Sequence, residues 1–186
     1  MNYIDISLAV SKNIPVWPGS PAPDVRLYQS MSEGSPSNNS MLSMELHGGT
    51  HFDAPLHFLP QGKSSDTSDL MSFLGVCYVA DVSGSRVISD ETLENAAIPN
   101  TERLLIKTGN SALYAEKQFS KTYAALDESA ARWILKRNMR LVGFDYLSIE
   151  CFENDGFSVH KLLLQHDVII LEGLNLHEVV PGVYTL

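Results

Sequence analysis

The sequence predicts an α/β fold in which a mixed sheet is flanked by helices. Continuous apolar runs at residues 76–82, 104–107, 141–145 and 168–171 are typical of strands buried on both faces. Segments with helical spacing separate the later runs, so strands and helices alternate along the second half of the chain. We expect the whole chain, residues 1–186, to form a single domain.

The first half of the chain predicts further strands. Residues 3–10 alternate imperfectly between apolar and polar side chains, whereas residues 25–28 and 42–46 alternate well. The stretch between these two runs, residues 32–40, is rich in Ser, Asn, Gly and Pro, which favours turns or mobility. Because it precedes a histidine-rich stretch, we interpret it either as an ordinary exposed connection or as a lid.

Three segments have the pattern of helices. Residues 90–97 follow Ser89, a suitable N-cap. Residues 127–136 place apolar side chains at helical spacing and begin with acidic residues, which suit the positive end of a helix dipole. Residues 158–166 have a similar apolar pattern.

The composition argues against several classes of function. There are 22 acidic residues against 13 Lys and Arg, a formal net charge of -9, and no basic cluster, so we expect no binding to nucleic acid or to anionic membranes. No run approaches the roughly 18 apolar residues of a membrane helix, and no signal-peptide pattern is present. Cys77 and Cys151 lie outside any CxxC pattern, which favours buried, inert thiols in a cytoplasmic protein.

Three of the six histidines lie within one stretch, HGGTHFDAPLH. Its glycines and proline argue against a helical HxxxH zinc motif. In an extended strand, side chains of equal parity share a face, so this spacing predicts that four side chains point the same way. These are His47, His51, Asp53 and His57.

Two imidazoles and a carboxylate are suitable ligands for divalent Zn, Mn or Fe. Coordination by His47, His51 and Asp53 would leave a position for water, whose pKa bound zinc lowers to about 7. His57 is then a candidate general acid or base, because an unperturbed histidine has a pKa of about 6.5. The alternative is that these are ordinary histidines of a strand.

The string HGGTHFDAPLHF resembles the HxGTHxDxPxHF signature of the cyclase-like metal hydrolases, the family of the bacterial kynurenine formamidases. Further similarity lies in the early DIS and PVWPG strings, in VGFD, and in the late VIILEGL run, in the family's order. The resemblance implies a swivelling β/β/α-type fold, a small-molecule substrate and a homo-oligomer, either a dimer or a tetramer.

The resemblance also implies the roles of individual residues. The residues that match the family's metal ligands are His47, His51, Asp53, His160 and Glu172. His57 matches the catalytic histidine, and Asp53 would bridge two metal sites. One or two ions per chain follow, with zinc expected and manganese as the alternative. Without the family, His160 is interpreted as an ordinary helix residue and Glu172 as a solvated strand end.

The implied activity is hydrolysis of a small amide by metal-bound hydroxide, with His57 as a proton shuttle. The closest family substrate is an N-formyl aryl amine such as formylkynurenine, and a lactone or cyclic amide would use the same groups. Two alternatives are a non-catalytic descendant that binds metal or ligand, and a structural oligomer with chance histidines.

Three nearby residues have competing interpretations. Trp17 is either an aromatic wall of the substrate pocket or a cap on the core. Phe58 has the opposite parity from the ligands, which favours core packing. Thr50 is expected to orient a ligand through a hydrogen bond.

The chain departs from the family's pattern at two places. The sequence DYLS at residues 145–148 stands where a Thr-Pro-Ser turn is common, so we expect this wall of the pocket to differ. The sequence stops at Leu186, where family members generally continue with another strand, so we expect a shorter C-terminus.

Overall fold

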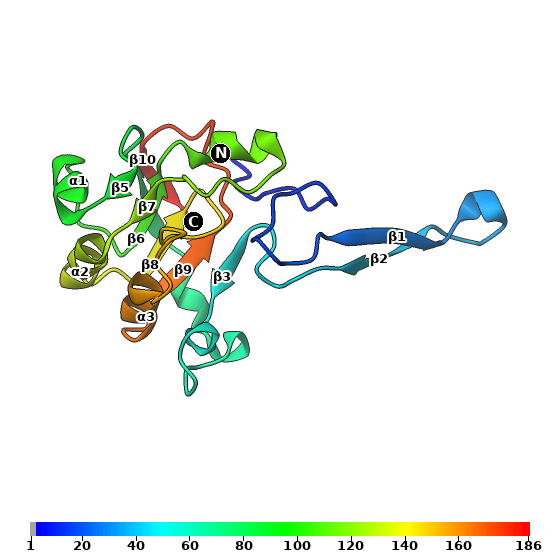
Figure 1. Ribbon diagram of the computed structural model, residues 1–186, viewed down its shortest axis with the longest axis horizontal. Helices are drawn as coiled ribbons and strands as arrows, with labels where there is room; N and C mark the ends of the chain where they lie inside the picture. Colours follow the sequence, from blue (N-terminus) through cyan, green and yellow to red (C-terminus); the bar gives the residue numbers. More distant parts are fainter. Residues whose placement is uncertain (1–2) are drawn as a thin grey trace.

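The computed structural model describes residues 3–186, which are built around a six-stranded mixed sheet (Figure 1). In spatial order its strands are β10 (Gly182–Thr185), β4 (Val76–Asp81), β6 (Arg103–Lys107), β8 (Leu141–Phe144), β9 (Ile169–Glu172) and β3 (His51–Asp53). The four inner strands are parallel, and both edge strands are antiparallel to their neighbours. The four continuous apolar runs are these inner strands, which confirms the predicted fold class.

Three helices cover one face of this sheet: α1 (Asp90–Asn95), α2 (Glu128–Lys136) and α3 (Ser158–Leu164) (Figure 1). Leu93, Ile134 and Leu163 of these helices share one hydrophobic cluster with Leu104 of the sheet. The neighbouring strand residue, Leu105, belongs to a second cluster on the opposite face, where non-helical segments pack. The inner strands are therefore buried on both sides, as their apolar runs predict.

The helix starts follow the predicted capping chemistry. The hydroxyl of Ser89 accepts a hydrogen bond from the amide of Thr92 at 3.3 Å, which caps α1. Asp127 is the N-cap of α2, and its carboxylate accepts from the amide of Ala130 at 3.0 Å. Helices α1 and α3 each end two residues before the predicted boundary.

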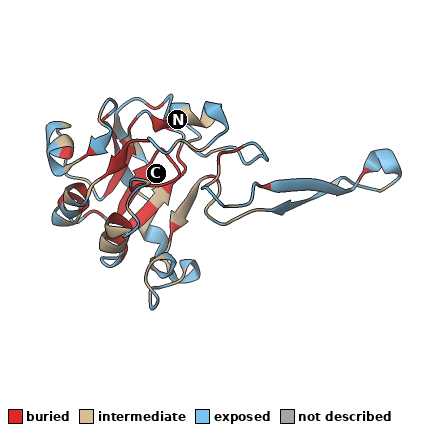
Figure 2. Ribbon diagram, in the orientation of Figure 1, coloured by how far each residue is buried: buried red, intermediate tan, exposed pale blue. Residues whose placement is uncertain are grey.

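Strands β1 (Asp24–Gln29) and β2 (Asn39–Ser43) form a separate antiparallel arm that projects from the sheet (Figure 1). Alternation in the sequence predicts a buried face here, but neither strand contains a buried residue (Figure 2). The predicted loop at residues 32–40, with the short 3-10 helix η1 (Met31–Glu33), lies at the tip, far from β3 (Figure 1). Its position excludes a lid over the same chain's histidine-rich stretch.

Two further sequence predictions are wrong in this part of the molecule. Residues 3–10 form no strand; they are attached by isolated hydrogen bonds, such as that from the Leu8 amide to the Thr50 hydroxyl at 2.7 Å. Cys77 is buried as predicted, but Cys151 is exposed, because it lies in a turn-rich segment that leaves the sheet.

The remaining short elements connect the sheet and helices. A small parallel pair is made by β5 (Val87–Ile88) and β7 (Ala125–Leu126). The 3-10 helices are η2 (Pro55–His57), η3 (Ser65–Thr67), η4 (Leu70–Ser72) and η5 (Asn110–Glu116). None of the described helices has the length and apolar character needed to cross a bilayer.

Candidate metal centre

The first part of the candidate site is built by a turn, the edge strand β3 and helix η2, and not by one extended strand. His51 and Asp53 lie on β3 and share a face, as their parity predicts. His47 precedes the strand in a turn, where Gly49 with a φ of 72° reverses the chain. His57 lies on η2. The prediction that His47 and His57 lie on the same strand is therefore wrong, although all four side chains meet.

The pairing of β3 with β9 brings the second half of the site to the first. His51 lies opposite Glu172 in this antiparallel register. A Cβ atom on the next residue, Gly173, would lie 2.0 Å from the carbonyl oxygen of Gly49, so only glycine permits this approach. Thr50 donates a hydrogen bond to the Gly173 carbonyl at 2.6 Å. Thr50 thus holds the backbone beside Glu172 and does not orient an imidazole as predicted.

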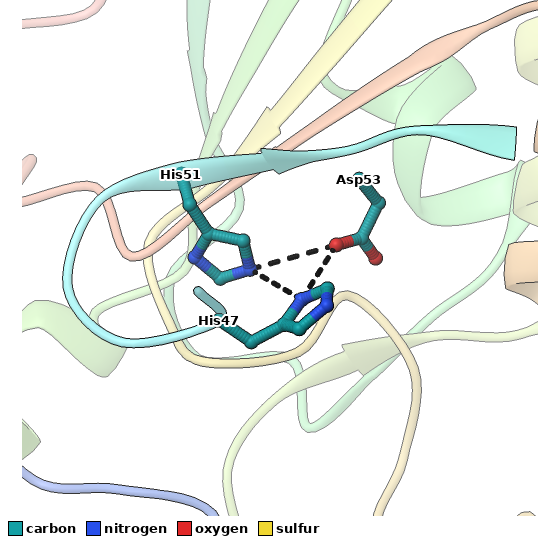
Figure 3. Close-up of side chains that lie close together, drawn as sticks. All are labelled: His47, His51 and Asp53. Carbon is teal, nitrogen blue, oxygen red and sulfur yellow. Dashed lines mark hydrogen bonds and ion pairs between the residues drawn. The ribbon is translucent and has the colours of Figure 1, made fainter. Parts of the chain in front are cut away.

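Three potential ligand atoms converge at β3 (Figure 3). Nδ1 of His47 lies 3.0 Å and Nε2 of His51 lies 3.5 Å from Oδ1 of Asp53, and the two ring nitrogens are 3.2 Å apart (Figure 3). Oδ1 of Asp53 is buried and forms no hydrogen bond of acceptable geometry within residues 3–186. A buried, unsatisfied carboxylate oxygen that faces two imidazole nitrogens fits the ligand set of a divalent cation.

A second group of potential ligands shares Asp53 with the first. Nε2 of His160 is 3.3 Å from Oε1 of Glu172 and 3.8 Å from Oδ2 of Asp53. In each group the ligand atoms all lie within 4.8 Å of one another. The structure therefore brings together all five residues that match the family's metal ligands, and Asp53 offers one oxygen to each group.

Glu150, which sequence analysis missed, lies behind His160. It is 1 % exposed, and its Oε2 accepts a hydrogen bond from Nδ1 of His160 at 2.7 Å. Its two oxygens also accept from the backbone amides of Val159 and His160 at the start of α3. When an ion is bound, the proton would stay on Nδ1 and the neutral ring would present Nε2 on the side of Asp53 and Glu172. A single acidic residue after a strand gives no sequence signal for this role.

The charges of the site favour a cation. Burial acts to raise the pKa of Asp53, but the neighbouring imidazoles, led by that of His47, hold it well below the usual range. Burial acts to lower the pKa of His160, but Glu150 and Glu172 raise it to about 10. The metal-free site therefore holds protons that a divalent ion must displace, so ion binding is expected to release protons.

His57 lies beside these groups without belonging to either. Its ring stacks on that of His47, with centroids 3.8 Å apart and an interplanar angle of 26°, and contacts Phe58 at 4.1 Å. Desolvation lowers the pKa of His57 and outweighs the opposing effect of the Asp53 carboxylate. The ring is therefore neutral near pH 7 and able to accept a proton.

A cavity of about 190 Å³ opens beside the metal ligands. Its aromatic lining is formed by Trp17, Phe58 and Phe157, and the segment that departs from the family's pattern contributes Leu147 and Ser148. Trp17 also packs against neighbouring aromatic rings, and Phe58 packs against the core as well. This volume is below the roughly 300 to 1,000 Å³ of drug-sized pockets and suits a small substrate.

Replacing Glu150 by glutamine should weaken metal binding at the group of Asp53, His160 and Glu172 by about 10- to 100-fold. Both oxygens of Glu150 accept hydrogen bonds, whereas an amide must turn an NH₂ group toward one set of donors. Calorimetric metal titration measures the effect. The exposed Glu153→Gln variant is the matched control, and equal affinities in the two variants would contradict this role.

Comparisons with known proteins agree with this geometry. Residues 4–151 match the model of the Cyclase family, described as "Putative cyclase". Kynurenine formamidase from Erythrobacter litoralis is 33% identical over 185 residues, which cover 98% of this chain and 83% of the relative. Cyclase-like protein 3 from Oryza sativa subsp. japonica is 34% identical over an alignment of 194 positions, which covers 98% of this chain and 72% of the relative.

Solved structures share the same fold. A potential metal-dependent hydrolase with cyclase activity superimposes with a TM-score of 0.83 and 31% identity. This match covers 98% of this chain and 86% of the hydrolase. An isatin hydrolase bound to the product analogue thioisatinate superimposes with a TM-score of 0.81 at 17% identity. This match covers 97% of this chain and 83% of the isatin hydrolase. The family match spans most of the sequence, and relatives above 30% identity span nearly all of it. The chain therefore belongs to the cyclase family.

Proposed function

We propose that this chain, a metal-dependent hydrolase, cleaves the formyl C–N bond of a small N-formyl aryl amine. The observation that carries the proposal is the unsatisfied Oδ1 of Asp53, which faces two imidazoles while His57 stacks on one of them. The aromatic cavity lies directly beside this arrangement. Similarity at 31–34% identity to several kynurenine formamidases supports a formamide as the substrate.

The five ligand candidates divide into two groups, so we propose one or two divalent ions per chain. The residues that would hold them are His47, His51, Asp53, His160 and Glu172. Zinc is the proposed metal, with manganese as the alternative, because both accept imidazole and carboxylate ligands. When bound, such an ion polarises the substrate carbonyl and lowers the pKa of water.

The remaining steps belong to side chains of the cavity. Trp17, Phe58 and Phe157 provide apolar surface against which the aryl ring can pack, which would hold the formyl group toward the metal ligands. The neutral His57 ring would take a proton from the attacking water. The same ring would then return the proton to the leaving aryl amine as the C–N bond breaks.

Removal of the metal by a chelator should abolish hydrolysis of an N-formyl aryl amine, and added zinc or manganese should restore it. The metal should also stabilise the fold, by about 2.7 kcal/mol at a free concentration 100 times its dissociation constant. Release of the aryl amine and the thermal midpoint, measured with and without metal, test both expectations. Metal-loaded protein that hydrolyses no formamide would refute the proposed activity and favour a non-catalytic binding protein.

We also propose that the chain forms a homo-oligomer through the β1–β2 arm. An isolated two-stranded hairpin is marginally stable, and this arm exposes Leu27, Tyr28 and Leu42 by 53%, 59% and 50%. Light scattering should show a dimer or larger assembly, and Leu27→Asp should shift it toward the monomer. Gln29→Glu adds a charge on the same strand and serves as a control for charge alone. A monomer at all concentrations would refute the assembly.

A further inference from the structure

The lining of the cavity beside the metal ligands includes one acidic residue that the proposed reaction does not use, Glu45. Glu45 is half-buried and lies two residues before His47. Its backbone carbonyl accepts a hydrogen bond from the amide of Gly48 at 3.1 Å, which places the residue in the turn that carries His47. Its carboxylate has no hydrogen bond or ion pair with any residue in the described part of the chain. The group is therefore available to a ligand.

No lysine or arginine of the cavity lining pairs with the Glu45 carboxylate. The remaining residues of the lining are acidic, aromatic, aliphatic or hydroxylic side chains and three histidines, with no lysine or arginine. Lys121 is engaged outside the lining, where its ammonium lies 4.8 Å from the centre of the Phe152 ring. Phe152 in turn contacts Trp17, with ring centroids 5.2 Å apart. The ions that the metal ligands would hold are the cations beside this cavity, and the carboxylates of Asp53 and Glu172 would offset their charge. A negatively charged substituent near Glu45 would therefore find no lysine or arginine to pair with in the lining.

We propose that Glu45 determines substrate specificity by charge. It would pair with a cationic substituent, such as an alkylammonium group on the aryl ring, and disfavour a carboxylate at the same position. The substrate class is then an aryl formamide with a cationic or neutral ring substituent. This inference rests on the proposed function, because it concerns the substrate of that same site.

The expected size of the effect follows from the partial burial of Glu45. An ion pair that remains partly exposed contributes a preference of about fivefold. Added salt should weaken this preference, because the charges are not fully shielded from solvent ions. Loss of apolar packing or of metal would instead affect substrates of every charge.

The test uses three N-formyl anilines that carry an aminomethyl, an ethyl or a carboxyl group at the same ring position. We expect kcat/KM of the metal-loaded protein to decrease in that order. The ratio of cationic to neutral substrate should fall about fivefold in Glu45→Gln. Glu178→Gln, which removes an exposed acid outside the cavity, should keep the wild-type ratio.

Two outcomes would overturn the proposal. One is an equal change of kcat/KM for all three substrates, and the other is a changed metal content in Glu45→Gln, which would make Glu45 a ligand. Calorimetric binding of the three corresponding anilines gives a readout that needs no turnover. If no formamide is hydrolysed, the proposed function fails, but the same charge order in aniline binding would still support Glu45 as the selecting residue. The absence of that order would refute it.

Discussion

Replacing His57 by phenylalanine should lower kcat for an N-formyl aryl amine by about 10²- to 10⁴-fold, the usual loss when a general acid or base is removed. The phenyl ring can keep the stacking contact with His47, whose ring centroid lies 3.8 Å from that of His57, but it has no nitrogen to carry a proton. The bound metal content should stay the same, because His57 belongs to neither ligand group. Steady-state rates and elemental analysis of the same preparation measure both quantities.

The comparison of two substitutions at His57 separates proton transfer from packing. His57→Ala removes both the nitrogens and the ring that covers His47, whereas His57→Phe removes the nitrogens alone. Similar losses of kcat in both variants would assign the effect to proton transfer. Undiminished hydrolysis by metal-loaded His57→Phe would exclude the proposed shuttle.

Asp53→Asn should remove metal from both ligand groups and lower kcat/KM by at least about 100-fold, because even residues that only orient metal ligands contribute 10- to 100-fold. Asp53 is the one residue that the two groups share. Asparagine is nearly isosteric, but it lacks the negative charge, and its NH₂ group cannot coordinate a metal. Metal stoichiometry and hydrolysis rate should therefore fall together.

The control for this change is Asp155→Asn, which removes the same charge at an exposed position. Circular dichroism of both variants verifies that the fold is retained. An Asp53→Asn protein that keeps two ions per chain and the wild-type rate would contradict the assignment of Asp53 as a shared ligand.

The inner sheet could be predicted from the sequence, because strands that are buried on both faces consist of continuous apolar residues. The run at β8, Leu141–Phe144, is apolar throughout and is buried throughout. The start of α1 could also be predicted from a local residue, because Ser89 is a suitable N-cap and caps this helix in the structure. These features depend on residues close together in the chain.

The arrangement of the site could be predicted only in part, because it depends on contacts between distant segments. The motif identified His51 and Asp53, but the turn at Gly49 that returns His47 to them depends on backbone conformation. The pairing of β3 with β9 is also non-local. Glu150 approaches His160 through a bend after β8 that no local pattern describes. Resemblance to the family supplied His160 and Glu172, which residue patterns alone did not.

Alternation also gives a wrong prediction for the β1–β2 arm. The run at β1 alternates as a half-buried strand would, yet both of its faces are exposed. Alternation shows that a strand has an apolar face and does not show which chain covers it. An arm that pairs with a second chain would have the same sequence pattern as an internal strand.

Anomalous diffraction at the zinc edge, from crystals grown with zinc, shows whether His47, His51 and Asp53 bind a metal ion. We expect a peak between His47, His51 and Asp53, with any second peak between Asp53, His160 and Glu172. Crystals with zinc bound elsewhere, and no anomalous density beside Asp53, would contradict this expectation.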